Sequence, residues 1–418
     1  MVDPSIDLVR RDGSFAWYWA GQSLSSFGSQ VSAMALPLVT ALSLGGSPAQ
    51  VGWVATSAML PYLLFSLLAG HWLEGRSNRA VMLPANLVQA ASMAVIPVAW
   101  ALGWLTVPLL VVVAFVQGCA ALCFGVVGFA YLPALVDEDE LAAANRALQG
   151  SRTVAEVAGP SLAGLLVGAL GAPLAIAVDA ASYLVSAVGI SRSRPRRSAH
   201  DVQRSTGSAG RPRITEGLRI LFTNAHLRAL TIHAALFNLA EQVFTLNLVL
   251  WAVQHQGLTP ARYGLAMGAA GVGGMIGTAT ALRLADRLGL GRAFAASLAL
   301  SCGAPLLVVV GDLRGIGLTL LLAAVMLLSG IGLGNANVYS LTMRQTAIPA
   351  DQLTRSAGAY TQLMYGSIPV GSALAGVLGQ HWGTRAATLA GACLMLASAL
   401  PMLSRRILRL RDTGSVAA

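Results

Sequence analysis

Three carboxylic acids, Glu156, Asp179 and Glu241, interrupt long apolar stretches of the sequence. A charged side chain at the centre of a membrane-crossing helix costs roughly 2.5–3.5 kcal/mol on insertion scales, so such a residue usually faces a cavity or a partner. Burial favours the neutral form of a carboxyl group, and a carboxyl group that alternates between its two forms can carry a proton. We therefore take the three acids as candidate proton-coupling residues, and this chemistry requires no metal and no cofactor.

Each acid also has a structural alternative. Glu241 is the first choice for proton coupling, but a protonated glutamic acid can instead hydrogen-bond within a helix bundle. Asp179 suits a structural hydrogen bond as well as coupling. Glu156 lies near Pro160, whose ring leaves a backbone group of its helix without a partner, and the carboxyl group can bond to a freed amide.

Neutral hydrogen-bonding side chains accompany the acids in the same apolar stretches. Asn238, Gln242 and Thr245 lie within about one helical turn of Glu241 and are placed to orient its carboxyl group. The wall of a polar cavity would further include Gln22, Ser26, Gln30, Asn335, Asn337, Gln362 and Tyr365. No arginine falls at the centre of an apolar stretch, so this lining favours a neutral or cationic amphiphilic molecule over a highly anionic one.

The apolar stretches that carry these residues are long enough to cross a membrane. The sequence is 56% hydrophobic and 11% charged, with a mean hydropathy of +0.68, whereas a soluble domain is usually about 25% charged. A helix needs roughly 20 apolar residues to cross the hydrocarbon, and lipid offers backbone amides no partner outside the helix. We expect an all-α integral membrane protein with twelve transmembrane helices, at about 15–42, 50–73, 80–101, 107–133, 149–170, 173–190, 228–253, 262–283, 292–311, 316–343, 357–379 and 384–403.

Arginine indicates how these helices are oriented. All 27 basic residues are arginine, and with twelve crossings only Arg262, Arg314 and Arg385 fall on the side opposite to the termini. Arginine gathers on the cytoplasmic side of membrane proteins. We therefore expect a multi-pass protein of a bacterial plasma (inner) membrane with both termini in the cytoplasm. This asymmetry accounts for the net charge of +10 without a nucleic-acid partner.

The chain also repeats itself at an offset of 212 residues. Repeated pairs include Pro48 and Pro260, Gly159 and Gly371, Gly171 and Gly383, and Ser186 and Ser398. Many transporters are built from two such halves and bind substrate between them near the bilayer midplane. We expect an N-terminal six-helix half over 1–190, an Arg-rich cytoplasmic linker over 191–226, a C-terminal half over 227–405 and a cytoplasmic tail over 406–418. Contact of the linker with anionic lipid or nucleic acid is the alternative to a flexible connection.

Two loops of the repeat share a charge pattern. The first carries Glu74, Arg76 and Arg79, and the second carries Asp286, Arg287 and Arg292. The pattern resembles the loop signature of the major facilitator superfamily, in which charge pairs around this loop favour the outward-facing state. The resemblance implies a gating role for these six residues, although Gly75 and Leu282 depart from the family pattern. Ordinary interfacial charges that end a helix are the structural alternative.

The fifth predicted helix carries small residues around a proline: Ala155, Gly159, Pro160, Ala163 and Gly164. Small residues four apart let another helix approach closely, and the proline removes a backbone donor. The run resembles the Gly-Pro-x-x-Gly-Gly motif in the fifth helix of family antiporters. By that resemblance Gly159, Pro160 and Gly164 indicate export, whereas generic helix packing is the structural alternative.

The wider pattern extends the resemblance over nearly the whole chain. It includes Trp17 to Gln22 at the start of the first helix and Asp179 to Tyr183 in the sixth. It is similar to the efflux branch that holds enterobactin-exporter-like and macrolide-efflux-like proteins. The resemblance implies a monomeric, proton-coupled exporter of a small amphiphilic drug, siderophore or secondary metabolite, working by alternating access and able to give multidrug resistance.

Other functions remain as alternatives to export. An uptake symporter would have the same fold, and a non-transporting membrane sensor would need a larger soluble segment than the 191–226 linker. Nucleotide-phosphate loops, histidine–acid metal motifs and nucleophile elbows are missing from the sequence, so we expect no enzyme.

Overall fold

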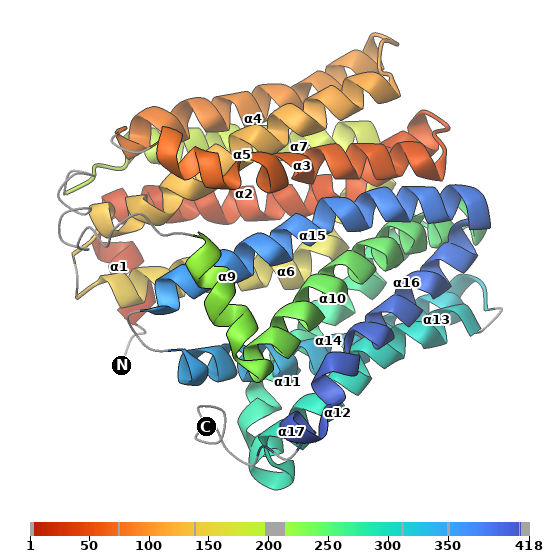
Figure 1. The fold of residues 1–418 in the computed structure, drawn as a ribbon. Helices are drawn as coiled ribbons and strands as arrows, with labels where there is room; N and C mark the ends of the chain where they lie inside the picture. The colour runs from red at the N-terminus through yellow and green to blue at the C-terminus, as the bar shows by residue number, and fades with distance from the viewer. Residues whose placement is uncertain are drawn as a thin grey trace. The chain divides into compact units, whose positions relative to one another are not determined.

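The computed structural model describes residues 4–73, 76–137, 139–196, 214–310, 313–348, 352–408 and 410. Every regular element in these ranges is a helix (Figure 1). The chain divides into two compact units: unit 1 contains residues 1–46 and 57–210, and unit 2 contains residues 47–56 and 211–418. Residues 197–213 of the predicted linker and 411–418 of the predicted tail lie outside the described ranges, so the predicted domain boundaries stay a prediction.

The helices follow one another with short connections. The first part of the chain forms α1 (Pro4–Arg11), α2 (Gly13–Leu38), η1 (Val39–Ser43), α3 (Pro48–Trp72), α4 (Asn78–Ala101), α5 (Val107–Leu135), α6 (Leu141–Leu170) and α7 (Ala172–Arg192). The second part forms α9 (Ile214–Thr223), α10 (Ala225–Leu250), η2 (Trp251–His255), α11 (Pro260–Leu288), α12 (Leu290–Gly303), η3 (Ala304–Leu306), α13 (Leu307–Val310), α14 (Gly315–Ala347), α15 (Leu353–Trp382), α16 (Thr384–Ser398), η5 (Leu400–Leu403) and α17 (Arg405–Leu408).

Helices occupy all twelve predicted stretches, so the predicted fold class is confirmed. Within the described residues, eight of them are long and apolar enough to cross a membrane by length and composition alone. Several helices continue past the apolar stretch: α6 begins at Leu141 rather than at residue 149, and α14 ends at Ala347 rather than at residue 343. The extra turns contain good helix formers, which extend a helix into water without needing lipid.

The backbone repeats with the sequence. The π-helices η1 and η2 start 212 residues apart, at Val39 and Trp251. Three pairs of glycines with positive φ have the same offset: Gly45 (62°) and Gly257 (64°), Gly103 (70°) and Gly315 (57°), and Gly171 (81°) and Gly383 (79°). A positive φ strains other residues, so these glycines set the same turns in both copies. The duplication is therefore one of backbone conformation as well as of residue type.

In unit 2, glycines bring α11 and α14 into close contact. A Cβ built on Gly273 would overlap the Leu327 carbonyl oxygen, and one built on Gly277 would overlap that of Ile331. In return, Gly330 and Gly334 of α14 face carbonyl oxygens of α11. Glycines four residues apart on each helix let the two backbones touch, as is common between membrane helices.

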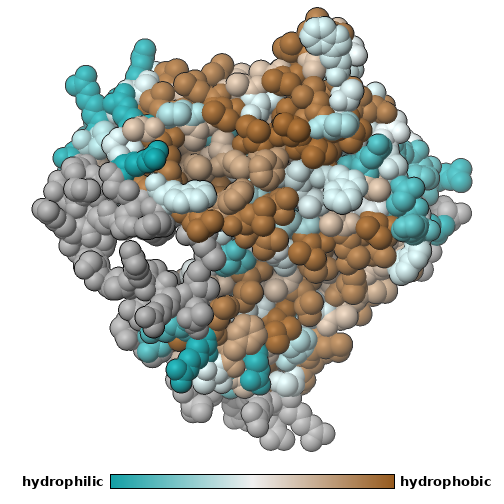
Figure 2. Space-filling model, turned by 45° about the horizontal axis from the view of Figure 1, so that its top comes forward, coloured by the Kyte–Doolittle hydropathy of each residue, from teal (hydrophilic) through white to brown (hydrophobic). Residues whose placement is uncertain are grey.

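Large apolar side chains cover much of the surface, as Figure 2 shows. Trp53, Trp104 and Leu282 are 63%, 71% and 70% exposed, and many leucines and valines are similarly exposed. In water, continuous apolar patches of this kind lead to association. Here they supply the surface that lipid tails contact, as expected for a multi-pass membrane protein.

Candidate functional site

The structure separates the three acids. Glu156 and Asp179 belong to unit 1, on α6 and α7, whereas Glu241 belongs to unit 2, on α10. Glu156 is half-exposed and pairs with Arg152, one turn earlier, at 3.2 Å. Sequence reasoning gave this carboxyl group a bond to a freed backbone amide near the proline, whereas in the structure it makes an exposed ion pair with Arg152.

Asp179 is completely buried between α2 and α7. The Ser32 hydroxyl donates to its Oδ2. The Ser182 hydroxyl lies 3.2 Å from its Oδ1 and 2.8 Å from its backbone oxygen. Gly28 completes the niche, because a Cβ at that position would lie 2.6 Å from Oδ1. Asp179 is therefore held in a small polar niche fitted to its carboxyl group.

A buried network of neutral polar side chains extends through unit 1 beside this niche. The Ser186 hydroxyl accepts from Gln22 at 2.9 Å and from Asn86 at 2.8 Å. Gln117 donates to Gln89 at 3.3 Å and to the Tyr183 hydroxyl at 2.8 Å. The network joins α2, α4, α5 and α7. Sequence reasoning singled out Gln22, but it missed the partners because a lone amide in an apolar stretch gives no sign of which helix faces it.

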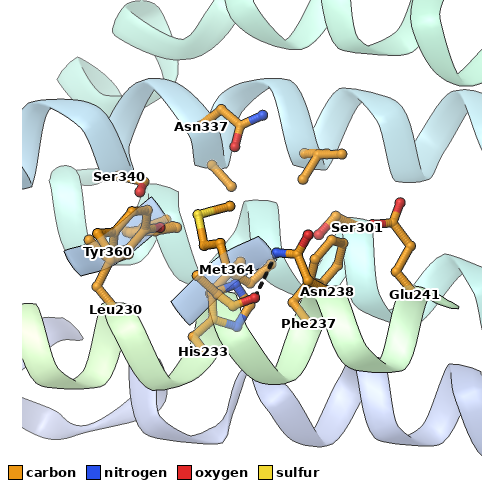
Figure 3. A pocket seen from close by; sticks show the side chains of 15 residues that line it. Leu230, His233, Phe237, Asn238, Glu241, Ser301, Asn337, Ser340, Tyr360 and Met364 are labelled. Carbon is orange, nitrogen blue, oxygen red and sulfur yellow. Dashed lines mark hydrogen bonds between the residues drawn. The ribbon is translucent and has the colours of Figure 1, made fainter. Parts of the chain in front are cut away.

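Glu241 lines a cavity of unit 2 (Figure 3). The cavity encloses about 200 Å³. Its wall is formed by Leu230, His233, Ala234, Phe237, Asn238, Glu241, Phe294, Leu298, Ser301, Leu333, Ala336, Asn337, Ser340, Tyr360 and Met364. Pockets for drug-sized ligands usually measure about 300–1,000 Å³, so this cavity fits the polar end of such a ligand or several waters.

Glu241 has no hydrogen-bond donor for its carboxyl group among the residues that the structure describes. Figure 3 shows the carboxyl group at one end of the cavity, near Ser301. The predicted orienting residues bond instead to their own helix: Asn238 donates to the Ala234 carbonyl at 2.8 Å, and Thr245 donates to the Glu241 backbone oxygen at 2.7 Å. A carboxyl group without a protein partner must bind a proton, water or a cation.

His233 lines the cavity between Leu230 and Asn238 (Figure 3). Its Nδ1 lies 2.9 Å from the Ser398 carbonyl oxygen. The cavity wall also contains Tyr360, and the Arg344 guanidinium stacks over that ring at 4.0 Å. Sequence reasoning did not include His233 or Tyr360. A histidine eight residues before an acid on one helix is a usable signal, since i and i+8 lie close to one helix face.

The remaining predicted cavity residues have different surroundings. Ser26 donates to the Gln22 backbone oxygen, and Gln30 packs against Gly159 of α6. Those in unit 2 that do not line this cavity are Gln242, Thr245, Asn335, Gln362 and Tyr365. Asn335 lies on α14 where it meets α11, and its buried Oδ1 has no partner within the described ranges. Of the predicted set, the cavity brings together Asn238, Asn337 and Glu241.

The small residues of α6 form a close contact within unit 1. A Cβ on Gly159 would lie 2.5 Å from Cγ of Gln30, and Gly164 is buried nearby. Pro160 lies within a helix that continues from Leu141 to Leu170. The close approach expected at Gly159 is present, and its partner is the Gln30 side chain on α2.

The predicted gating residues are mostly exposed. Glu74 lies outside the described residues, and Arg76 and Arg292 are exposed. Arg79 donates to the Ser191 backbone oxygen, at the last turn of α7, where a cation also meets the negative end of the helix dipole. Asp286 and Arg287 border a surface hollow with Tyr339 and Thr342, and within the described ranges Asp286 makes no ion pair. The latch pairing of these residues stays a prediction.

Unit 1 does contain a charge cluster, which sequence reasoning did not predict. Arg196 lies 2.5 Å from Asp137, 3.0 Å from Glu140 and 3.1 Å from Asp12, and Arg11 also bonds to Glu140. Partial burial of Glu140 opposes ionisation, but hydrogen bonds and charge from Arg196, helped by Arg11, lower its pKa overall. Glu140 stands at the start of α6 but makes no capping bond to that helix, because its carboxylate pairs with arginine.

Comparison with known proteins shows what this chain is similar to. It is 27% identical over 403 residues to a multidrug efflux pump, Tap, of Mycobacterium bovis, covering 93% of this chain and 92% of that protein. It is 23% identical over 223 residues to macrolide efflux protein A of Streptococcus pyogenes, covering 53% of this chain and 55% of that protein.

Solved structures share the fold. A bacterial homologue of the iron transporter ferroportin matches with a TM-score of 0.73 at 17% identity, over 94% of this chain and 99% of that one. A nucleoside transporter matches with a TM-score of 0.75 at 14% identity, over 93% and 99%. The family model of the Major Facilitator Superfamily matches residues 18–368, and it matches again over 239–416, as expected for a duplicated chain. The protein is therefore a multi-pass membrane transporter that belongs to the Major Facilitator Superfamily.

Proposed function

We propose that the chain is a proton-coupled exporter of small amphiphilic compounds, working by alternating access as a monomer in a bacterial plasma membrane with both termini in the cytoplasm. The single observation that carries this proposal is the Glu241 carboxyl group, which lines a cavity of a membrane unit and has no partner among the described side chains. The efflux names of the similar proteins support export rather than uptake.

Glu241 links the proton to the substrate through its charge. An ionised carboxylate without a protein partner is costly in a membrane-spanning unit, and either a proton or a bound cation removes that cost. When the cavity opens to the more acidic side, a proton occupies Glu241 and the substrate leaves. When it opens to the cytoplasm, the proton leaves and the carboxylate attracts the next substrate. Because the proton and the substrate cannot occupy the Glu241 carboxyl group together, proton entry drives substrate exit.

The lining determines which compounds fit. Phe237, Phe294, Tyr360 and Met364 offer aromatic and polarisable surface, and Asn337 offers an amide. Aromatic faces favour a nearby cation, and an apolar wall favours an apolar body. We therefore assign amphiphilic substrates that are neutral or cationic, with the polar end at Glu241 and the remainder of a larger compound outside this cavity.

The other two acids have different parts in this proposal. Asp179 holds α2 to α7 through its bond with Ser32, and Glu156 is an exposed charge that pairs with Arg152. Proton coupling therefore rests on unit 2.

Transport into everted membrane vesicles tests the proposal. Ethidium should accumulate when the vesicle lumen is acidified, because an exporter moves it from the cytoplasmic face into the lumen in exchange for protons. Glu241→Gln should abolish this accumulation, whereas Glu156→Gln, the matched control, should retain it at equal protein levels. Full accumulation by Glu241→Gln would remove Glu241 from the mechanism, and expulsion of ethidium from the acid lumen would mean uptake.

A further inference from the structure

We propose that His233 is a second proton-binding site of the unit 2 cavity, and that a proton on its Nε2 opposes the binding of a cationic substrate at Glu241. The inference rests on the proposed function and deepens it, because it makes the cavity take up two protons for each cation released. It is carried by the geometry of the ring and its neighbours rather than by the histidine alone.

The hydrogen bond to Ser398 fixes which nitrogen of His233 carries hydrogen in the neutral ring. A carbonyl oxygen only accepts, so Nδ1, at 2.9 Å from the Ser398 carbonyl, must be the donor. The Ser398 hydroxyl lies 3.3 Å from the same nitrogen, but it donates to the Met395 carbonyl at 2.6 Å and does not compete as a donor. The neutral ring therefore has its lone pair on Nε2.

Nε2 is left to the cavity. His233 belongs to the cavity wall, and within the described part of the chain no partner bonds to Nε2. A proton that enters the cavity adds to this lone pair and gives an imidazolium, while the Nδ1–H bond to Ser398 is retained. The reaction needs no other group to move, because the ring already rests against Phe237 with the ring centroids 5.8 Å apart.

The charged groups around His233 are few, so its protonation changes how strongly the cavity binds a cationic substrate. Glu241 lies two turns further along α10, roughly 12 Å along the axis, with Asn238 between them (Figure 3). Tyr360 on α15 lines the same cavity, and Cys302 on α12 follows the lining residue Ser301. Arg344 on α14 is a nearby fixed cation, and it stacks on Tyr360 and donates to the Ser340 carbonyl. From α16 the ring meets the carbonyl and hydroxyl of Ser398, neither of which titrates.

The consequence is a stronger exclusion of cations at acid pH than Glu241 alone would give. Protonation removes the negative charge of Glu241 and adds a positive charge on His233. By linkage, one competing proton weakens binding by about tenfold per pH unit below its pKa, and two weaken it by up to about a hundredfold.

Ethidium binding to the purified protein between pH 5 and 8 measures this difference, because the probe has a permanent charge and its fluorescence rises in apolar sites. The dissociation constant of the wild type should increase by more than tenfold for each pH unit at the acid end. His233→Asn should increase by at most about tenfold, and should bind more tightly than the wild type at pH 5. The asparagine amide replaces Nδ1–H toward Ser398, so the fold is retained, and thermal unfolding checks this.

His255→Gln is the matched control, since His255 lies on η2 beside Thr384 and outside the cavity. It should leave the pH slope unchanged. Side-chain nitrogen NMR of the histidines gives an independent readout without ligand: one signal that His233→Asn removes should be an Nδ1–H ring and should gain a proton as the pH falls. A ring that stays neutral throughout, or equal slopes in the wild type and His233→Asn, would overturn the inference. Glu241→Gln could lose the pH dependence of ethidium binding while the wild type and His233→Asn keep equal pH slopes. That result would overturn this inference and leave the proposed function intact.

Discussion

Replacement of Asp179 tests whether this residue has a structural role or carries protons. In Asp179→Ala the Ser32 hydroxyl loses its carboxyl acceptor and is left with the Met93 sulfur at 3.7 Å, a weak acceptor. Ser182 keeps its 2.8 Å bond to the backbone oxygen of residue 179 and loses little. One unsatisfied buried hydroxyl costs about 1–3 kcal/mol, and the void adds to it, so the expected loss of stability is about 2–4 kcal/mol.

Asp179→Asn should be nearly neutral. Its amide oxygen can accept from Ser32, and its NH₂ group can donate to the Ser182 hydroxyl, whose own hydrogen points to the backbone. The loss should therefore be about 1 kcal/mol or less. Reversible unfolding in mixed micelles measures the free energies, and vesicle export should survive in Asp179→Asn. Equal destabilisation by asparagine and alanine, or loss of export in a stable Asp179→Asn protein, would refute a structural role.

Two further predictions concern helix contact and surface charge. Gly277→Ala should destabilise unit 2 by about 1–3 kcal/mol, because the new Cβ meets the Ile331 carbonyl, whereas Gly274→Ala, with its nearest contact at 3.9 Å, should not; equal losses would contradict the glycine contact. Arg196→Gln should lower stability near neutral pH by about 1 kcal/mol or less. Arg196 lowers the pKa of Glu140, so its contribution to stability is present above the ordinary carboxyl pKa of 4.5 and is lost as the pH falls through the lowered pKa. When unfolding is measured at decreasing pH, the free energies of unfolding of the wild type and Arg196→Gln should therefore become equal.

Sequence periodicity predicted the helices well because each membrane helix must satisfy its own backbone, so its length and apolarity appear locally. The sequence repeat of Gly171 and Gly383 is matched by a positive φ at both positions in the structure. Side-chain partners could not be predicted in this way. Gln22 stood out in an apolar stretch, but its bond to Ser186 depends on the packing of α2 against α7. Glu241 is unpaired among the described side chains because the neighbouring helices bring no partner near its carboxyl group. The local sequence around Glu241 does not contain this information.

The corresponding helix contact is formed by different residues in the two units. In unit 1, α2 meets α7 through Ser32 and Asp179, a buried polar pair. Their counterparts at the 212-residue offset are Phe244 and Gly391, and a Cβ on Gly391 would lie 2.7 Å from the Phe244 Cα. Unit 2 therefore joins α10 to α16 by direct backbone approach, without a charge. The acid of unit 1 is needed where the glycine is missing, which agrees with a holding role for Asp179.

The same register explains why ionisable groups gather in unit 2. Glu241 takes the place of Ser29, and His233 takes the place of Gly21. In unit 1 the glycine brings α2 close to α7, and a Cβ on Gly21 would lie 3.0 Å from the Ser186 Cα, so no ring fits there. In unit 2 the histidine fills that place and bonds to the repeated serine, Ser398. Both replacements line one cavity and both add a titratable group, so unit 2 contains the two side chains on which the proposed proton binding depends, whereas their counterparts in unit 1 are a serine and a glycine.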